Sequence, residues 1–229
     1  MMQYLQEHSW PEISYAVSQC ARFTHSPRQS HEVALERIGL YLKGTMKDGL
    51  ILRPSKDLRI DVFVDADFAG LWPHEDKLDP TCVKSHTGFV ICIANCPVIW
   101  QSKLQSEIVT STTEAEYIAL SQAMHSVLPF LVVAKVLKSY IGLEDNETTF
   151  KVRVWEDNSA CHTLANLEPG RTTPRTKHYA IKLHWFCSKL EQNNIKIEKI
   201  LTDQQRADIF TKGLQKNKFP AIRKLLCGW

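Results

Sequence analysis

The sequence predicts an α/β protein whose mixed sheet is preceded by a short helical segment. Three strand-like runs come first within residues 57–104, and helical and strand-like runs then alternate to the C-terminus. Strands joined by a tight turn are typical of antiparallel pairs, and strands separated by helices are typical of parallel ones. The 229 residues, 44% hydrophobic and 23% charged, are enough for one large domain or a small domain with an appendage.

The first 56 residues are predicted to be helical. Ser9–Phe23 carries apolar residues at helical spacing, with Ser9 as the N-cap and Pro11 in the first turn. A second helix is predicted over His31–Lys43, before a turn-rich connection. We therefore predict two parts, a helical segment over 1–56 and an α/β domain over 57–229.

Residues 57–229 alternate between strand-like and helical patterns. The predicted elements, in order, are a strand over 59–68, a long polar loop over 70–86, a hairpin of strands over 87–94 and 98–104, a helix over 111–127 continued after Pro129 to Tyr140, a strand over 150–157, helices over 158–167 and 177–192, a strand over 194–201 and a helix over 203–214.

Composition narrows the functional classes. A formal net charge of +3 is compatible with nucleic-acid binding without being an argument for it. No uninterrupted apolar run approaches the roughly 18 residues that span a bilayer, and the N-terminus has no secretory pattern. Seven cysteines without a tight framework favour reduced thiols, with a zinc site around Cys92 and Cys96 as the less favoured alternative. We expect an intracellular, cytoplasmic protein.

Four acidic residues have comparable places in this pattern. Asp65 and Asp157 end two strands, Glu116 lies on the first helix after the hairpin, and Asp208 lies on the last predicted helix. Ligands of open α/β sheets bind at the carboxyl ends of strands, so neighbouring strands would bring Asp65 and Asp157 together. Clustered carboxylates repel unless a hard cation such as Mg²⁺ or Mn²⁺ neutralises them. Taken singly, each acid has an ordinary interpretation as a turn former, a helix start or a solvated helix face.

Glu114 and Glu116 compete for the same role. Glu116 heads the apolar stripe of its helix, whereas Ser111 and Glu114 have the spacing of a capping box. We therefore predict that Glu116 faces the site and that Glu114 stabilises the helix start.

Six motifs occur in an informative order: VDADFAG, KSHTGFV, STTEAEYIALSQA, VWEDNSA, PRTKHYAIKLHWF and RADIFTKGL. Together they resemble the ribonuclease H domain of copia-like LTR retrotransposon polyproteins. Upstream, ISYAVSQCARF and HEVALERIGLYLKGT resemble the helical, thumb- or connection-like C-terminal end of the reverse transcriptase of these elements. The resemblance implies a ribonuclease H-like five-stranded mixed sheet with flanking helices. It also implies that Asp65, Glu116, Asp157 and Asp208 are the catalytic, metal-binding residues.

The same resemblance implies a function and partners. The expected activity is Mg²⁺-dependent cleavage of the RNA strand of RNA–DNA hybrids by two ions, with Mn²⁺ as a substitute. The expected partners are an RNA–DNA hybrid and the upstream reverse transcriptase domain of the same polyprotein, with no membrane. Virus-like particles in the cytoplasm are the expected location, with nuclear access left open. No polymerase activity is expected, because a Tyr-x-Asp-Asp motif is absent. As a separate departure from many relatives, no His precedes the last predicted helix.

Basic residues supply candidate contacts to nucleic acid. The predicted nucleic-acid-binding residues are Arg171, Arg175, Lys177, His178 and Lys182. Such a cluster would contact phosphates without reading sequence, and its alternative is a solvated basic helix face. Two further groups are open between a site and a solvated surface. They are the loop residues His74, Glu75, Asp76 and Asp79, and the C-terminal residues Lys212, Lys216, Lys218, Arg223 and Lys224.

Two other functions fit the sequence. A catalytically decayed fragment would bind nucleic acid without cutting it, although all four acids are present. Another two-metal nuclease on the same fold, of the integrase or resolvase type, would space its acids differently.

Overall fold

The computed structural model describes residues 1–72, 75, 78–140, 150–165 and 180–228, and its centre is a five-stranded mixed sheet. The strands lie in the order β3-β2-β1-β4-β5. Their bounds are β1 Ile60–Asp67, β2 His86–Ile93, β3 Cys96–Leu104, β4 Val152–Glu156 and β5 Ile195–Lys199. The first three strands pair antiparallel, and β4 and β5 continue the sheet parallel to β1.

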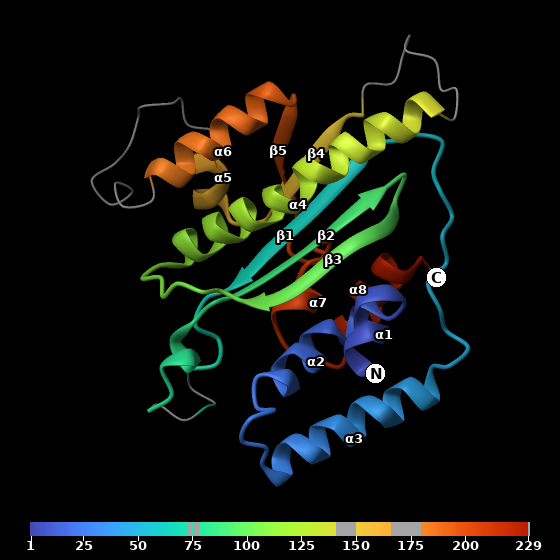
Figure 1. Cartoon of the computed structure of the whole chain (residues 1–229), viewed down its shortest axis with the longest axis vertical. Coiled ribbons are helices and arrows are strands. Elements are labelled where there is room, and N and C mark those ends of the chain that lie inside the picture. Colours follow the sequence, from blue (N-terminus) through green and yellow to red (C-terminus); the bar gives the residue numbers. More distant parts are fainter. Residues whose placement is uncertain (73–74, 76–77, 141–149, 166–179, 229) are drawn as a thin grey trace.

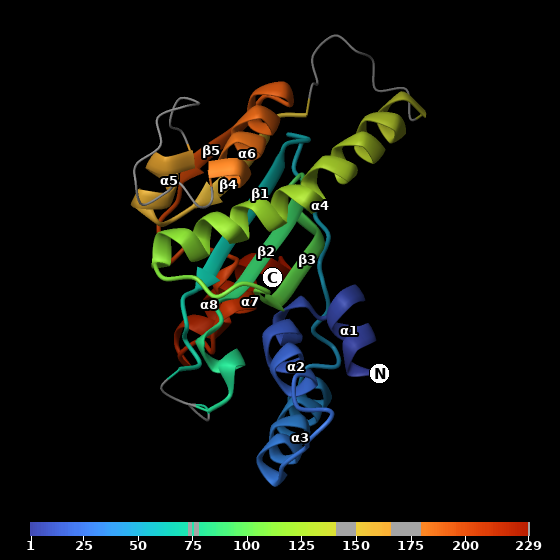
Figure 2. The same ribbon diagram turned by 60° about the vertical axis from the view of Figure 1, so that its left-hand side comes forward.

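Alternating residues of β1 serve two different cores. Val62 and Val64 are fully buried under α4 (Thr112–Tyr140), and α5 (Ser159–Ala165) and α6 (Ala180–Gln192) lie on the same face (Figures 1 and 2). Phe63 points to the opposite face, where it packs with residues of α7 (Asp208–Thr211) and α8 (Lys218–Cys227). The sheet therefore has a helical layer on each side, as the period of two in a strand requires.

The N-terminal segment lies on the α7 and α8 side of the sheet. It consists of α1 (Met2–His8), a 3₁₀ turn over Pro11–Ile13, α2 (Ser14–Ala21) and α3 (Gln29–Gly44). It has a small core of its own around Ile13, Val17 and Ile38. Residues 45–59 then run along the molecule to the start of β1 (Figure 1).

The fold class predicted from the sequence is confirmed by strand number, order and direction. The predicted boundary near residue 56 stays a prediction. Residues on both sides of it are in close contact, since the Ile51 amide donates to the Cys227 carbonyl at 2.9 Å.

The prediction of one helix over Ser9–Phe23 is wrong. Ser9 ends α1, which the prediction missed, and the chain restarts as a 3₁₀ turn at Pro11 before α2 begins at Ser14. The cause is local, because a proline disfavours the helical conformation of the preceding residue. Trp10 accordingly lies outside the helical region, at φ −130° and ψ 68°.

The helix α4 differs from the prediction in two respects. It is one continuous helix of 29 residues that passes through Pro129, which lies on its exposed side between the buried residues Val127 and Leu131. By length and composition, Thr112–Lys138 is also long and apolar enough to cross a membrane. The prediction from the sequence concerned only uninterrupted apolar runs, and this helix contains polar residues among its apolar ones. Of its most apolar window, 56% is buried inside the protein, where α4 packs on the sheet, whereas Val132, Val133 and Leu137 are exposed.

Candidate active site

Strand register places two of the predicted acids side by side. The parallel pairing of β1 with β4 runs from Ile60↔Val152 to Phe63↔Trp155, and extending it two residues sets Asp157 level with Asp65. Glu116 joins them from the second turn of α4. Ligand oxygens of Asp65, Glu116 and Asp157 all lie within 4.8 Å of one another. The structure thus brings together three of the four predicted acids, while their role as ligands stays a prediction.

Glu116 is oriented by the start of α4. The Glu114 amide donates to Ser111 Oγ at 3.2 Å, so Ser111 caps the helix as the sequence indicates. The Glu114 carboxylate accepts from the Thr110 amide at 3.0 Å, one residue before the predicted Ser111 partner. Glu116 turns inward with 7% exposure, and its Oε2 is buried without a hydrogen-bond partner. An unpaired, buried carboxylate oxygen beside two other acids is suited to a cation.

Asp65 lies on the α7 side of β1 and is almost fully buried. Thr211 donates a hydrogen bond to Asp65 Oδ2, and the Lys212 ammonium lies 3.3 Å from the same oxygen. Burial raises the pKa of Asp65 to about 7, with Lys212 and the Thr211 hydrogen bond acting against the rise and Asp208 adding to it. Burial also raises the pKa of Glu116, with the charges of Glu156 and Asp65 acting in the same direction. A bound cation would therefore release protons from this site.

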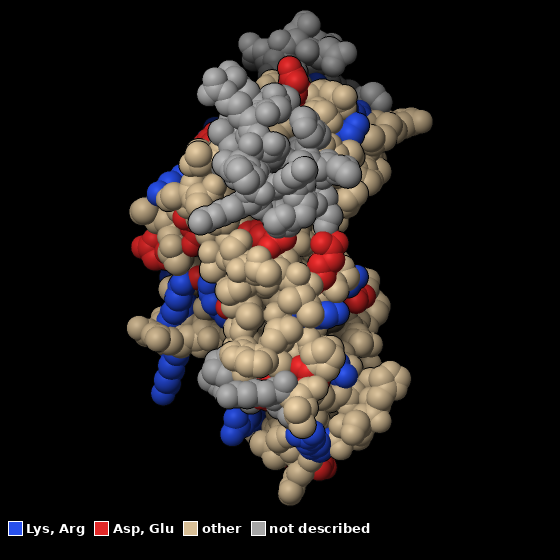
Figure 3. All heavy atoms as spheres, turned by 90° about the vertical axis from the view of Figure 1, so that its left-hand side faces the viewer, with Lys and Arg blue, Asp and Glu red and all other residues tan. Residues whose placement is uncertain are grey.

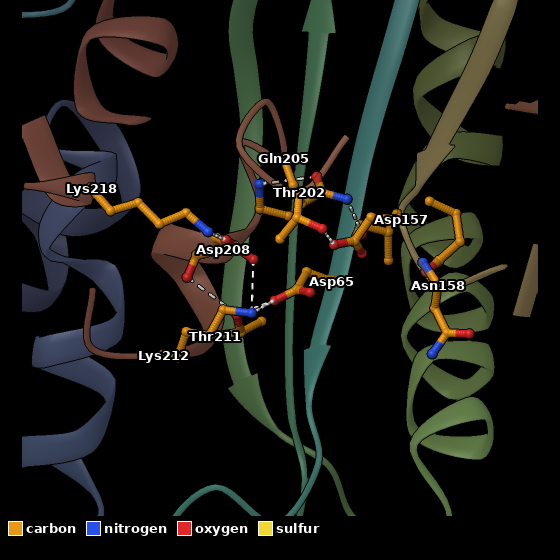
Figure 4. A network of polar contacts seen from close by, with 12 residues as sticks. Asp65, Asp157, Asn158, Thr202, Gln205, Asp208, Thr211, Lys212 and Lys218 are labelled. Carbon is orange, nitrogen blue, oxygen red and sulfur yellow. Dashed lines mark hydrogen bonds and ion pairs between the residues drawn. The ribbon is translucent and has the colours of Figure 1, made fainter. Parts of the chain in front are cut away.

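Asp157 sits at the exit of β4, at the more exposed side of the cluster. Thr202 Oγ1 donates to Asp157 Oδ2 at 2.9 Å (Figure 4). The next residue, Asn158, caps α5 by accepting from the amides of Ala160 and Cys161, both at 3.0 Å. The cap fixes the chain direction directly after Asp157, so its carboxylate is held at the strand end.

Asp208 is the fourth predicted acid, and the structure holds it with lysines rather than within the three-acid group. It is fully buried at the first residue of α7. Lys212 lies 2.8 Å from its Oδ1, and Lys218 pairs with its Oδ2 (Figure 4). Lys212 thus links Asp208 to Asp65. The alternative of a solvated C-terminal end is wrong for these two lysines and for Arg223, which is buried against Glu12.

Glu156 is a buried acid that the sequence analysis missed. It is fully buried, its Oε1 accepts from the Asn158 amide at 3.0 Å, and its Oε2 has no hydrogen-bond partner. Burial raises its pKa well above the usual value. The alternation of Val152, Val154 and Glu156 along β4 is the signal that would have found it, since it places Glu156 on the core face.

The predicted nucleic-acid-binding stretch falls outside the described residues. This holds for Arg171, Arg175, Lys177 and His178, while Lys182 lies on α6 with its side chain undescribed. Figure 3 views the left-hand side of Figure 1, where Asp and Glu side chains reach the surface near the middle of the face and Lys and Arg side chains stand in separate groups.

In the loop after β1, two acids have structural partners. Glu75 forms a double contact with Arg22 at 2.8 and 2.9 Å, and Asp79 caps a 3₁₀ turn (Pro80–Val83). His74 and Asp76 lie outside the described residues. A solvated loop is therefore wrong for Glu75. None of the seven cysteines, all of which lie among the described residues, forms a disulfide.

The donor set fits a divalent cation. Asp65, Glu116 and Asp157 offer only carboxylate oxygens, which hard cations such as Mg²⁺ and Mn²⁺ prefer. Three acids within 4.8 Å repel one another when ionised, and the unpaired Glu116 oxygen leaves a ligand position open.

Two structures are similar to the chain at a low level. The ribonuclease H1 named LC11, isolated from compost, is 18% identical with a TM-score of 0.45, over 67% of this chain and 93% of that one. The same enzyme in complex with an RNA/DNA hybrid gives a TM-score of 0.43 at 18% identity, over 67% of this chain and 94% of that one. The fold assignment rests on strand order and direction and not on these similarities.

Sequence comparison gives longer matches. No protein-family model matches the chain. The retrovirus-related Pol polyprotein from transposon TNT 1-94 of Nicotiana tabacum is 31% identical over 216 residues, 94% of this chain and 15% of that protein. The corresponding polyprotein from transposon RE1 of Arabidopsis thaliana is 30% identical over 224 residues, 95% of this chain and 14% of that protein. The chain thus spans about one-seventh of these relatives, and it is homologous over nearly its whole length to a segment of the Pol polyproteins of copia-like retrotransposons.

Proposed function

We propose that the protein is a divalent-cation-dependent endonuclease that cleaves the RNA strand of RNA–DNA hybrids during retrotransposon reverse transcription. The observation that carries the proposal is the group formed by Asp65, Glu116 and Asp157, within 4.8 Å at the carboxyl end of β1 and β4. The homologous Pol polyproteins and the ribonuclease H-like sheet support the same reaction class.

The positions of the acidic residues indicate which cation each of them would bind. Asp65, Glu116 and Asp157 would hold the first cation, and Asp65 with Asp208 would flank a second. When bound, Mg²⁺ or Mn²⁺ ions make an attacking water nucleophilic and stabilise the leaving 3′ oxygen. Thr202 and Thr211 fix two of the carboxylates by hydrogen bonds, so the ligand oxygens are held before a cation arrives.

The proposed substrate and partner follow from the relatives. We take the substrate to be an RNA–DNA hybrid. One structure of the ribonuclease H1 LC11 contains such a hybrid. We take the partner to be the reverse transcriptase domain of the same polyprotein. Lys and Arg side chains would contact phosphates, and binding would then weaken with salt and tolerate any sequence.

Cleavage of a labelled RNA–DNA hybrid, against matched duplex RNA and duplex DNA, tests the proposal. We expect cleavage of the hybrid with Mg²⁺ and none with EDTA. Asp157→Asn should lower the rate by roughly two to three orders of magnitude, as when a group that stabilises transition-state charge is lost. Binding of the hybrid should persist. Asp203→Asn, an exposed aspartate nearby, is the matched control and should cut normally.

Other outcomes distinguish the alternatives. Hybrid binding without cleavage in any divalent cation would identify a decayed, binding-only fragment. Cleavage of duplex DNA in preference to the hybrid would identify a nuclease of the integrase or resolvase type. Full activity of Asp157→Asn would remove Asp157 from the site.

A further inference from the structure

Lys212 lies inside the carboxylate cluster, and the proposed reaction gives it no role. Its ammonium is 2.8 Å from Asp208 Oδ1 and 3.3 Å from Asp65 Oδ2 (Figure 4). The Asp65 and Asp208 side chains are 3% and 0% exposed, whereas that of Lys212 is 35% exposed. Lys212 therefore reaches in from the surface and ends between two buried acids.

The positive charge of Lys212 reduces the repulsion between the buried carboxylates of Asp65 and Asp208. Two buried carboxylates near one another repel, and an ammonium between them stabilises both ionised forms. Burial acts to lower the pKa of Lys212, but Asp65 and Asp208 together raise it above its ordinary value. Lys218 pairs with the other oxygen of Asp208, so each acid has a positively charged neighbour without any metal ion.

The place that Lys212 occupies is the one a second cation would need. The first ion is expected at Asp65, Glu116 and Asp157, where Glu116 Oε2 has no hydrogen-bond partner. A second ion between Asp65 and Asp208 would meet the Lys212 ammonium. The two cannot share the position, because like charges at contact distance repel.

We infer that Lys212 is a positioning residue, a tethered cation that holds the place between Asp65 and Asp208 until a second divalent ion displaces it. The inference rests on the proposed function for the identity of the first ion's site. A lysine suits this role because its charge sits on a flexible stem of four carbons and its side chain is partly exposed, so it can leave toward solvent. The second ion should therefore bind more weakly than the first, because it must replace an existing ion pair.

Mn²⁺ binding to the full chain tests the inference, with free Mn²⁺ measured by electron paramagnetic resonance. In the wild type we expect two classes of site whose dissociation constants differ by about tenfold or more, which corresponds to about 1.4 kcal/mol. Lys212→Met should tighten the weaker site by about tenfold and leave the tighter one within about threefold. Lys212→Arg keeps the charge and should keep the second site weak. Lys216→Met removes an exposed lysine and should change neither site.

The outcomes separate this inference from the proposed function. Unchanged weak-site affinity in Lys212→Met, with the tight site intact, overturns the inference and leaves the nuclease proposal standing. No Mn²⁺ binding in the wild type overturns both. Thermal melting reports whether Lys212→Met is folded, and Lys212→Gln, which also removes the charge, replaces it if it is not. The Mg²⁺ concentration for half-maximal cleavage should fall in parallel with the tightened second site.

Discussion

Glu114 and Glu116 stand two residues apart on one helix and have opposite surroundings. Glu116 is buried beside Asp65 and Asp157, whereas Glu114 accepts from the Thr110 amide at the helix start. We expect Glu116→Gln to abolish hybrid cleavage, because an amide oxygen supplies no charge to a cation. Glu114→Gln should cost about 0.5–1 kcal/mol of stability and leave cleavage largely intact. Parallel cleavage assays and thermal melts check this, and a dead Glu114→Gln beside an active Glu116→Gln would contradict it.

His86 gives a second residue-scale prediction, on pH. It is 2% exposed, and its Nε2 lies 2.9 Å from Ser102 Oγ. Burial, with a smaller contribution from the charge of Arg22, lowers the pKa of His86 to about 3. Below pH 6.5, the ordinary pKa of histidine, His86 binds a proton in the unfolded chain but stays neutral in the folded chain. The free energy of unfolding therefore falls as the pH falls from about 6.5 toward 3. The loss should approach about 1.4 kcal/mol per pH unit.

Chemical unfolding of the wild type and His86→Gln between pH 7 and pH 4 isolates this effect. The difference between them should shrink as pH falls, because the variant lacks the titrating group. The exposed His25→Gln is the control and should follow the wild type. Parallel stability curves for wild type and His86→Gln would contradict the assignment.

Single residues also show how far the site could be predicted. Asp65 and Asp157 follow from strand ends and Glu116 from the apolar stripe of its helix, and the structure brings these three together. Glu156 was within reach, because strand alternation alone turns it to the core face. The position of Lys212 could not be predicted, because the sequence around a lysine does not show whether its side chain is solvated or turned inward. Its direction depends on α7, which contacts between distant segments put in place.

At the scale of elements, the approach of α7 to β2 decides the geometry around Asp65. Gly88 pairs with Asp65 across the two strands, and α7 lies directly over it. A Cβ on Gly88 would lie 2.6 Å from Phe210 Cβ and 2.7 Å from Thr211 Cγ2. The missing side chain is what lets α7 come close enough for Thr211 to reach Asp65.

Gly88→Ala should therefore push α7 away from the sheet. We expect a loss of about 1–3 kcal/mol of stability from overpacking and weaker Mn²⁺ binding, because Asp208, Thr211 and Lys212 move together. Gly39→Ala is the control, since nothing lies within 4 Å of a Cβ there, and it should be neutral or stabilise α3. Unchanged melting temperature and Mn²⁺ affinity in Gly88→Ala would refute this account.

Elements differed in how well the sequence predicted them. The five strands were predicted because their alternation is set within each strand. The split at Pro11 was missed because apolar spacing continues across a break that proline imposes on the backbone. The continuity of α4 through Pro129 was missed because packing on the sheet decides it.

At the scale of the whole molecule, a buried ion pair joins the 3₁₀ turn over Pro11–Ile13 to α8. Glu12 and Arg223 have 3% and 11% exposed side chains and lie 3.3 Å apart, and Arg223 also contacts Asp48 at 3.0 Å. Arg223→Met should cost about 3–5 kcal/mol, because it leaves the Glu12 carboxylate buried without that charge. Lys224→Met, on the exposed side of the same helix, should stay within about 0.5 kcal/mol. Equal unfolding midpoints for the two variants would contradict this role of Arg223.

The same contacts impose an order of events on a chain made from its N-terminus. Glu12 and Cys227, whose thiol lies 3.7 Å from the Glu12 carboxylate, are 215 residues apart in sequence. Translation produces α2 before β3 and α7, the elements on which it packs, so the buried face of α2 stays open to solvent and to chaperones until those elements have been made. Non-local contacts of this kind slow folding and lengthen the time in which apolar surface can aggregate. A ribosome that stalls before residue 208 would therefore hold a chain in which α2 lacks α7 and Glu12 lacks the charge of Arg223.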